Sequence, residues 1–460
     1  MKARLILGLL LVLSLVAAIG YAQEPAARRL SLAEALTLAR ANNPAYRSTL
    51  NNRWAASSQA TSSSLRLITP SASVTGSHMR EQGSERYSPE LASILPSPIV
   101  TTPGSSSTGW GIAFGYALSG QIIADRGLAR AELRATDADI AGSATVLETL
   151  VRQQYLNVLQ AQAQVALAQH VLDRANETLN LARARNSVGQ GTLIDVRRAE
   201  VEKGQAEVGL LRANQTVENQ VLMLFQRLGV PAPEPARVTL TDSFPVTAPN
   251  LNGDSLLALA LRVNPALVAL RARETAATWG VRSAYSQYAP SLSASVSYAR
   301  ARYSTANFQG LDTTTAPPSI IWADTTVTSI RPWTLNIGVQ LPLYDRFERS
   351  ATTARARAAL DDAHLAIRGQ ELAVRAEVTS AYLALVAAYQ TIALQQNNKA
   401  ASAEALTLAT ERYRVGSGTF IELLDARVTA ERADADYVIA TYDYHRAFAS
   451  LENAVGRPLR

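Results

Sequence analysis

The sequence of 460 residues contains no cysteine and only four histidines. Without cysteine, the chain cannot form disulfide bonds, a thiolate metal site, a thiol nucleophile or the acylated N-terminal cysteine of a lipoprotein. The histidines lie far apart, without the spacing of metal ligands. Charged residues are also few, at 18%, whereas hydrophobic residues make up 47% of the chain. This balance favours a folded protein with a sizeable core over a disordered chain.

Sequence features of enzymes and of nucleic-acid-binding proteins are missing as well. The net charge of +6 comes from dispersed arginines rather than a basic block, so no nucleic-acid partner is expected. The carboxylates are too dispersed to suggest an acid–base pair, and neither a Ser-His-Asp order nor a phosphate-binding loop is recognisable. We therefore expect no enzymatic activity, no cofactor and no metal site.

Residues 1–22 have the pattern of a signal peptide. Lys2 and Arg4 precede an apolar run over Leu5–Ala18, and a small-x-small cleavage site follows at 20–22. The alternative, a membrane-spanning helix, requires a longer apolar run. The mature chain is therefore expected to be exported. We find no later hydrophobic span in the sequence, so a membrane would have to be crossed by strands.

Long helices are predicted where proline is missing. All nineteen prolines lie outside two windows, 104–230 and 343–457, and a proline inside a helix costs about 3 kcal/mol. In both windows, apolar or small residues recur every seven residues, which is typical of a coiled-coil seam. The seam positions are Val151, Val158, Val165, Leu172 and Leu179 in the first window, and Leu360, Ile367, Val374, Ala381 and Ala388 in the second. An ordinary coiled coil would also fit this pattern.

Each window is divided once by a Val-Gly-x-Gly-Thr motif, at 188–192 and at 415–419. The glycines can adopt the positive φ of a helix C-cap, and the threonine can cap the helix that follows. The windows therefore predict two helical hairpins, about 126–228 and 346–455, whose first limbs are about 95–105 Å long. A dinucleotide-binding interpretation of the glycines fails because no strand precedes them.

Four segments alternate between polar and apolar residues and predict two-faced strands. They lie at about 69–80, 108–120, 291–303 and 331–341. Such strands, with aromatic residues at their ends, match a transmembrane β-barrel, although a half-buried soluble sheet would fit the pattern equally well. Four strands cannot close a barrel, because the smallest barrels have about eight. In a membrane, several chains would have to share one barrel.

The second half of the chain repeats the first. An Asn-Pro pair at 43–44 recurs at 264–265, and the two glycine motifs are 227 residues apart. We predict a first structural repeat over 23–250 and a second over 251–460, joined by the proline-rich stretch that ends the first. Each repeat has two helices, a strand, a long loop, a second strand and a helical hairpin.

With the opening Ser-Leu-x-Glu-Ala-Leu-x-Leu-Ala-x-x-Asn-Asn-Pro at 31–44 and the two glycine motifs, the duplicated unit resembles the TolC-type outer-membrane efflux protein family. The resemblance covers essentially the whole mature chain. It implies a mainly α protein with a membrane β part. In a homotrimer, four strands per protomer would build a shared twelve-strand outer-membrane barrel above a periplasmic α-barrel of helical hairpins. The chain departs from many relatives by lacking the lipoprotein cysteine and by a long loop at 81–107.

The resemblance also implies a function and partners. The trimer would export substrates from the periplasmic end of a tripartite efflux or secretion complex. It would contact outer-membrane lipid, a periplasmic adaptor (membrane fusion) protein and, through the adaptor, an inner-membrane pump. The segments 81–107 and 304–330 each join two of the predicted strands and are rich in serine, threonine and proline, so we expect them to be extracellular loops. The adaptor would dock on the hairpin tips, formed by Val188, Gly189, Gly191, Thr192, Val415, Gly416, Gly418 and Thr419.

The family places an acidic constriction at positions that Glu422 and Asp425 occupy here, and Asp195 matches Glu422 in the first repeat. Helical spacing puts Glu422 and Asp425 on one face, so three chains would form two stacked acidic rings that favour cations. Alternatively, these are ordinary surface charges, with Asp425 paired to Arg427 or Arg414.

Two other functions remain open at this point. A general porin would need more strands and no long heptad helices. An exported coiled-coil structural or attachment protein would have the helices but no channel. The exported compound is not encoded in these motifs, and a drug, a metal ion or a secreted peptide would fit equally well.

Overall fold

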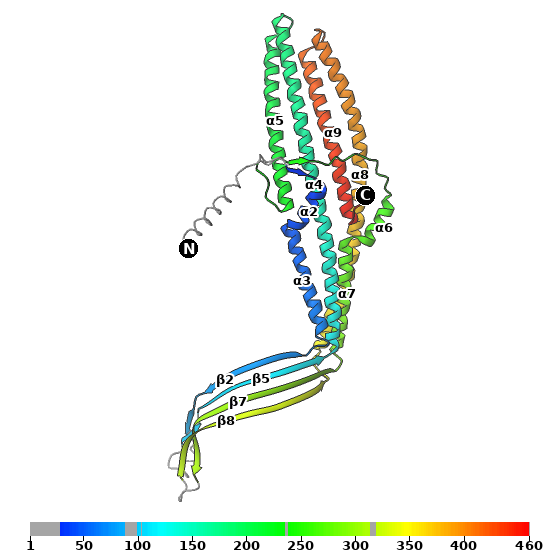
Figure 1. The fold of residues 1–460 in the computed structure, drawn as a ribbon. Coiled ribbons are helices and arrows are strands. Elements are labelled where there is room, and N and C mark those ends of the chain that lie inside the picture. Colours follow the sequence, from blue (N-terminus) through cyan, green and yellow to red (C-terminus); the bar gives the residue numbers. More distant parts are fainter. Residues whose placement is uncertain (1–27, 88–98, 103, 235–237, 313–318, 460) are drawn as a thin grey trace, which may run out of the picture. The chain divides into compact units, whose positions relative to one another are not determined.

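The computed structural model describes residues 28–87, 99–102, 104–234, 238–312 and 319–459 (Figure 1). The predicted signal peptide lies outside the described residues. The chain divides into two compact units. The helical unit comprises the described parts of 1–54, 135–271 and 366–460, and the sheet unit comprises 55–134 and 272–365.

Long helices dominate the helical unit, as the proline-free windows predicted. It contains α2 (Leu32–Asn42), α5 (Leu193–Leu228), α6 (Gly253–Val263) and α9 (Phe420–Val455). Further helices carry residues of both units: α3 (Pro44–Leu65), α4 (Gly120–Ser187), α7 (Pro265–Ser286) and α8 (Glu348–Arg414). With 68 and 67 residues, α4 and α8 are each about 100 Å long at 1.5 Å per residue. Each forms a hairpin with the shorter helix that follows it, α5 or α9.

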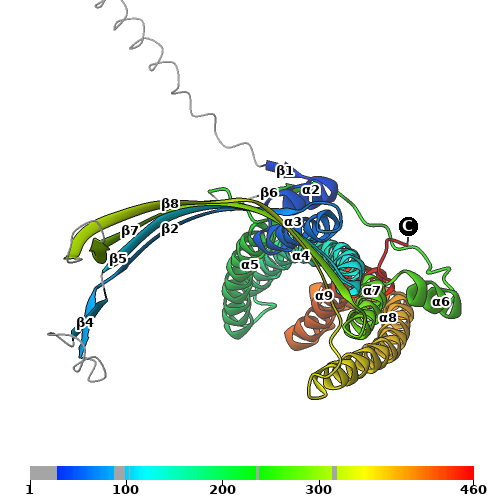
Figure 2. The same ribbon diagram turned by 90° about the horizontal axis from the view of Figure 1, so that it is seen from below.

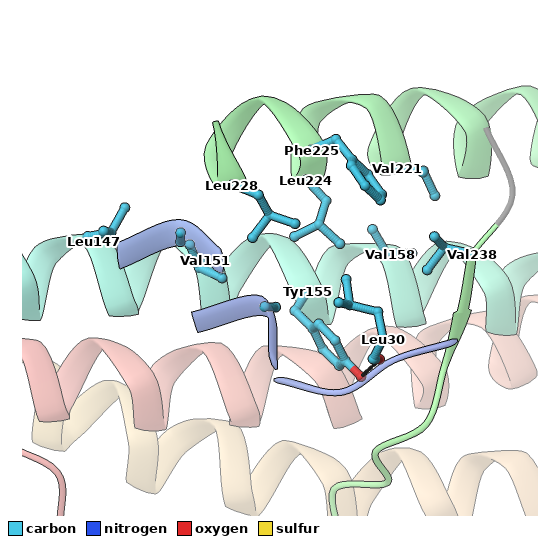
Figure 3. Close-up of a cluster of buried hydrophobic side chains, with 12 residues drawn as sticks. Leu30, Leu147, Val151, Tyr155, Val158, Val221, Leu224, Phe225, Leu228 and Val238 are labelled. Atoms are coloured by element: carbon cyan, nitrogen blue, oxygen red, sulfur yellow. Dashed lines mark hydrogen bonds between the residues drawn. The ribbon is translucent and has the colours of Figure 1, made fainter. Parts of the chain in front are cut away.

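The predicted seams supply the cores of both hairpins. Val151 and Val158 of α4 are fully buried against Leu224 and Phe225 of α5 (Figure 3). In the second hairpin, a matching cluster joins α8 and α9 around Val374, Val378, Leu385, Tyr444 and Leu451. Burying each such side chain contributes about 1.5–3 kcal/mol. Several of the heptad positions, including Val151, Val158 and Val374, are therefore core positions within one chain.

The Asn-Pro pairs are joints between short helices and hairpin ends. Asn43 and Asn264 end α2 and α6, and each is followed by a proline at the first position of the next helix, where no N–H is needed. The Asn43 side-chain amide donates to the Arg227 carbonyl oxygen at 2.9 Å, near the end of α5. The Asn264 side-chain amide likewise donates to the Ala454 carbonyl oxygen at 3.0 Å, near the end of α9. Each pair therefore fixes a short helix to its hairpin.

A linker between the two halves is held by tyrosines. The short strands β1 (Arg28–Leu30) and β6 (Val238–Leu240) pair in parallel. The Tyr155 hydroxyl of α4 donates to Asp242 Oδ2 at 2.8 Å and lies 2.9 Å from the Leu30 carbonyl oxygen, the contact drawn in Figure 3. Burial, followed by this contact with Asp242, raises the pKa of the Tyr155 phenol. Farther along, the Tyr382 and Tyr444 hydroxyls donate to Leu251 and Thr247.

The sheet unit contains one curved antiparallel sheet (Figures 1 and 2). Its strands lie in the order β2 (Ser71–Glu81), β5 (Ser105–Leu118), β7 (Ser291–Asp312) and β8 (Ser319–Gln340). A two-stranded ribbon of β3 (Ser84–Tyr87) and β4 (Ile99–Thr102) continues between β2 and β5. Two bulges interrupt the β7–β8 pairing, between Ser297 and Ala299 and between Thr305 and Phe308.

The structure corrects two of the predicted loops. The segment 304–330 is strand over much of its length, because β7 and β8 continue to Asp312 and from Ser319. Part of the segment 81–107 forms β3 and β4. Serine and threonine suggested loops in both segments, but threonine also favours strands when a neighbouring strand pairs with it.

The two faces of the sheet differ in chemistry. One face, here called the apolar face, carries Val74, Phe114, Tyr298, Trp333 and Leu335, which the pairing register places on the same side. The opposite face carries Gly111, Gly115, Ser293, Ser295 and Ser297. The apolar side chains are largely exposed within this chain; for example, Val74 is 76% exposed.

Among the described residues, two helical stretches have the length and hydropathy of a membrane span. The expectation that no hydrophobic span follows the signal peptide is therefore wrong by these two criteria. The stretches are Gly253–Ser286 and a window within α8. The first is interrupted at Asn264, where α6 ends and α7 begins. Only 28% and 17% of the two windows are buried within the chain.

Candidate functional site

The two hairpin tips have the same turn. Gly189 and Gly416 adopt positive φ angles of 76° and 84°, which disfavour other residues. The second glycines pack closely on the preceding helix: a Cβ at Gly191 or Gly418 would lie 3.1 Å from the Cβ of Arg185 or Arg412. Each motif therefore requires its first glycine for backbone conformation and its second for space.

The threonines cap the outgoing helices, as predicted, but the two caps differ. Thr192 Oγ1 accepts from the Asp195 N–H at 3.2 Å, and Asp195 Oδ2 accepts from the Thr192 N–H at 3.3 Å. Thr419 Oγ1 likewise accepts from the Glu422 N–H at 3.2 Å, but these two residues do not form the reciprocal capping box of the first tip. Instead, Glu422 Oε2 lies 3.7 Å from Arg412 Nη2 on a half-exposed surface. Asp195 is thus engaged in its cap, whereas Glu422 remains at the surface.

A small hydrophobic cluster, here called the tip core, joins the two tips. It contains Leu179 and Ala182 of α4, Val196 and Ala199 of α5, Tyr413 of α8, and Phe420 and Leu423 of α9. Its aromatic rings, Tyr413 and Phe420, have centroids 5.7 Å apart. The tips of one chain are therefore packed together.

Arg185 holds the same junction from outside the tip core. Its guanidinium donates to the Tyr413 carbonyl oxygen at the end of α8 and, at 2.9 Å, to the Gln190 carbonyl oxygen in the first turn. It also lies 4.5 Å from the centre of the Tyr413 ring, a cation–π contact. Burial raises the pKa of the Tyr413 phenol, and the Asp195 charge adds to this rise while Arg185 opposes it. The first turn and the end of α8 thus share one arginine.

A second group of charges, here called the inner ion cluster, lies farther along the hairpins. Arg427 of α9, whose side chain is 5% exposed, pairs with Glu202 of α5 and lies 3.3 Å from Glu431 Oε1. The Asp434 carboxylate of α9 forms ion pairs with Lys399 of α8 at 3.2 Å and with Arg174 of α4 at 3.6 Å. A cavity of about 730 Å³ lies beside these groups, lined by α4, α8 and α9. All four helices of the two hairpins therefore contribute charges here.

The structure changes the expected pairing of the acidic residues. Arg427 is buried with Glu202, and Arg414 pairs with Glu411 of its own helix at 2.6 Å. Asp425 is exposed and forms no ion pair with another described residue. The proposed pairing of Asp425 with Arg427 or Arg414 is therefore wrong.

Sequence reasoning missed Arg185, Tyr413 and Glu202. Arg185 could have been found, because the repeat places it at the position equivalent to Arg412, 227 residues later. Both arginines come shortly before a glycine motif, so both could have been expected to contact a tip. Tyr413 and Glu202 carry no such signal, since asparagine and threonine stand at the equivalent positions, Asn186 and Thr429.

Comparisons with known proteins agree with this architecture. The family model described as outer membrane efflux protein matches residues 35–230 and again residues 256–457. The chain is 26% identical over 310 residues to the outer membrane efflux protein BepC of Brucella suis, which covers 66% of this chain and 61% of BepC. The chain thus matches less than two thirds of that relative's length.

Solved structures share the fold. A membrane protein from Pseudomonas aeruginosa superposes with a TM-score of 0.73 at 21% identity, over 93% of this chain and 90% of that one. The open state of the MtrE outer membrane channel of Neisseria gonorrhoeae gives a TM-score of 0.68 at 21% identity, over 93% and 89% of the two chains. The resemblance found in the sequence and the outer-membrane localisation that it implied are confirmed, and the chain belongs to the outer membrane efflux protein family.

Proposed function

We propose that three copies of this chain form an outer-membrane channel that exports substrates from the periplasmic end of a tripartite efflux or secretion complex. The observation that carries this proposal is the sheet. Its edge strands, β2 and β8, have no further partner among the described strands, and one of its faces is apolar. In a bilayer, unpaired backbone groups cost several kcal/mol each, so the edges must pair. Edge pairing around three chains closes twelve strands.

The helices support the same assembly. Exposed apolar side chains recur along the outer faces of α8 and α5, where a neighbouring chain would cover them. They include Leu372, Leu383, Leu394 and Leu408 of α8, and Val201, Val208 and Leu211 of α5. Three pairs of hairpins would form the periplasmic tunnel.

The hairpin tips are the proposed docking site of a periplasmic adaptor, which links the channel to an inner-membrane pump. Val188 and Val415 begin the two motifs and are 68% and 71% exposed. Beside them, the glycines at 189, 191, 416 and 418 leave the turns without bulky side chains. Another helical hairpin could therefore approach the backbone of Thr192 and Thr419 closely.

The assembly is tested on protein extracted from outer membranes with detergent. We expect a trimer by light scattering and discrete conductance steps in planar bilayers, because a closed barrel with a tunnel conducts ions. A stable monomer with intact strand signal would contradict the shared barrel. Release without detergent would favour the structural, channel-free protein instead.

Replacing both Glu422 and Asp425 with alanine should lower the preference of the channel for cations. These exposed carboxylates lie three residues apart on α9, so six of them would face a narrow entrance in the trimer. Reversal potentials in a salt gradient measure this preference. The matched control replaces Glu377 and Glu404, exposed carboxylates of α8, with alanine. Unchanged selectivity in the Glu422/Asp425 variant would place these groups outside the conducting path and end the acidic-ring proposal.

A further inference from the structure

The apolar face of the sheet ends at a row of aromatic side chains. Trp110, Tyr298 and Trp333 come from three neighbouring strands, and their ring centroids are 5.7 Å and 5.4 Å apart. From Leu118 to Trp110 on β5, the face is about 27 Å long at 3.4 Å per residue. With the strand tilt of about 35–45° found in outer-membrane barrels, this length covers about 20 Å along the membrane normal, close to the apolar band of about 25 Å that aromatic rows delimit. In the proposed barrel, the aromatic row would therefore mark one edge of the bilayer.

Basic side chains lie on the same face, at that edge and immediately beyond it. Arg300 of β7 is the register partner of Trp110, and Arg302 is the partner of Thr108 in the next row outward. His78 of β2 is the other partner of Thr108, and its Nδ1 lies 2.7 Å from Thr108 Oγ1. Arg80 lies one row farther out. Because neighbouring strands are about 4.8 Å apart, His78 and Arg302 are about 10 Å apart.

These four residues are here called the basic patch. All four are exposed, and none of the three arginines forms an ion pair with another described residue. The nearest carboxylate in sequence is Glu81, but it follows Arg80 and so points to the opposite face, where it accepts a hydrogen bond from Ser105. Exposed positive charges concentrated at a bilayer edge are complementary to anionic headgroups.

The position of the patch selects the leaflet. The sheet leads into α4 at the end marked by Leu118, and the helices are periplasmic in the proposed channel. The basic patch lies toward the other end of the strands, in and beyond the aromatic row, so in the proposed channel it lies at the outer leaflet. In the proposed barrel, the opposite face of the sheet, with its small polar residues, would face the water-filled lumen. The basic patch would therefore face lipid and not the lumen.

We propose that the basic patch binds the phosphate groups of phosphorylated glycolipids in the outer leaflet. This proposal rests on the proposed barrel, because the barrel makes the apolar face the lipid face. Guanidinium groups bind phosphate oxygens in bidentate geometry, and the patch presents three of them beside one imidazole. The trimer has three such patches around the rim of the bilayer.

The test measures binding of bisphosphorylated lipid A to the purified wild-type trimer by native mass spectrometry. Wild type should bind lipid A at least tenfold more tightly than the same lipid after enzymatic removal of its phosphates. The triple variant Arg80→Gln, Arg300→Gln, Arg302→Gln should lose this preference while keeping its trimeric mass and conductance. The control variant replaces three exposed helical arginines, Arg130, Arg368 and Arg375, with glutamine and should bind as wild type does.

Several outcomes would overturn the proposal. Equal binding of phosphorylated and dephosphorylated lipid by the wild-type trimer would overturn it. This comparison needs no variant, so it remains valid even if the triple variant does not assemble. Undiminished binding by an assembled triple variant would also exclude the patch. Displacement of lipid A by an equal concentration of inorganic phosphate would assign the patch to a free anion. Because conductance is recorded on the same trimers, a failed channel is distinguished from a failed lipid site.

Discussion

An Arg185→Ala channel should spend more time open than the wild-type channel. The arginine joins the first hairpin turn to the Tyr413 carbonyl oxygen at the end of α8. In the proposed channel, opening the entrance would require these hairpins to separate. A hydrogen bond to a charged group contributes about 1.5–3 kcal/mol. A loss of about 2 kcal/mol in each chain would change its open-to-closed ratio roughly 30-fold.

Single-channel recordings of the Arg185→Ala trimer measure this effect as a rise in mean conductance. Arg183→Ala is the matched control, because Arg183 is two residues away but pairs with Glu200 within its own hairpin, at 2.9 Å. That variant should conduct as wild type does. If Arg185→Ala also leaves conductance and open time unchanged, the contact between the tips does not restrain the entrance.

Arg427→Ala should destabilise the helical unit by about 3 kcal/mol, since removing one partner of a buried ion pair leaves the other charges uncompensated. The Arg427 side chain is 5% exposed, and Glu202 and Glu431 both depend on it. Denaturant unfolding of the solubilised trimer measures the loss. Arg197→Ala, which removes an exposed i,i+3 pair with Glu200, should change stability by less than about 1 kcal/mol.

The pH dependence of this loss identifies its cause. Burial raises the pKa of the Glu431 carboxyl, and the Arg427 charge opposes that rise, so the pKa rises further in the variant. A carboxyl with a raised folded-state pKa contributes most stability below its unfolded-state pKa, and the contribution is lost as the pH rises through the folded-state value. The difference between wild type and variant should therefore be larger at pH 8 than at pH 5.5. Equal differences at both pH values would point to lost packing instead.

Local features of the fold could be predicted from the sequence, because their causes lie within a few residues. The glycines at 189 and 416 and the threonine caps depend on backbone geometry inside one turn. The heptad seam likewise indicated the buried positions Val151 and Val158. The ends of β7 and β8 could not be found in this way, because serine and threonine fit both loops and paired strands.

Contacts between the hairpins depend on how the two halves pack. Arg185 donates to the carbonyl oxygen of a residue 228 positions away, and Arg427 pairs with a residue 225 positions away. Nothing near Arg427 in the sequence distinguishes it from the exposed Arg414, and only the packed helices bury it between two half-buried carboxylates, Glu202 and Glu431. For the same reason, the acidic constriction remains a prediction: Glu422 and Asp425 are exposed in one chain, and their role depends on two others.

The near-identity of the two hairpin turns affects how many copies of a docking partner the proposed trimer could bind. Both turns place glycine at positive φ and begin the next helix with a threonine cap, so three chains would display six nearly equivalent turns. A partner that recognises only this backbone would meet sixfold symmetry and could bind six copies to a threefold channel. A partner that recognises the Arg412–Glu422 pair would find it once per chain, because Asp195 is occupied in its own cap, and would bind in threes.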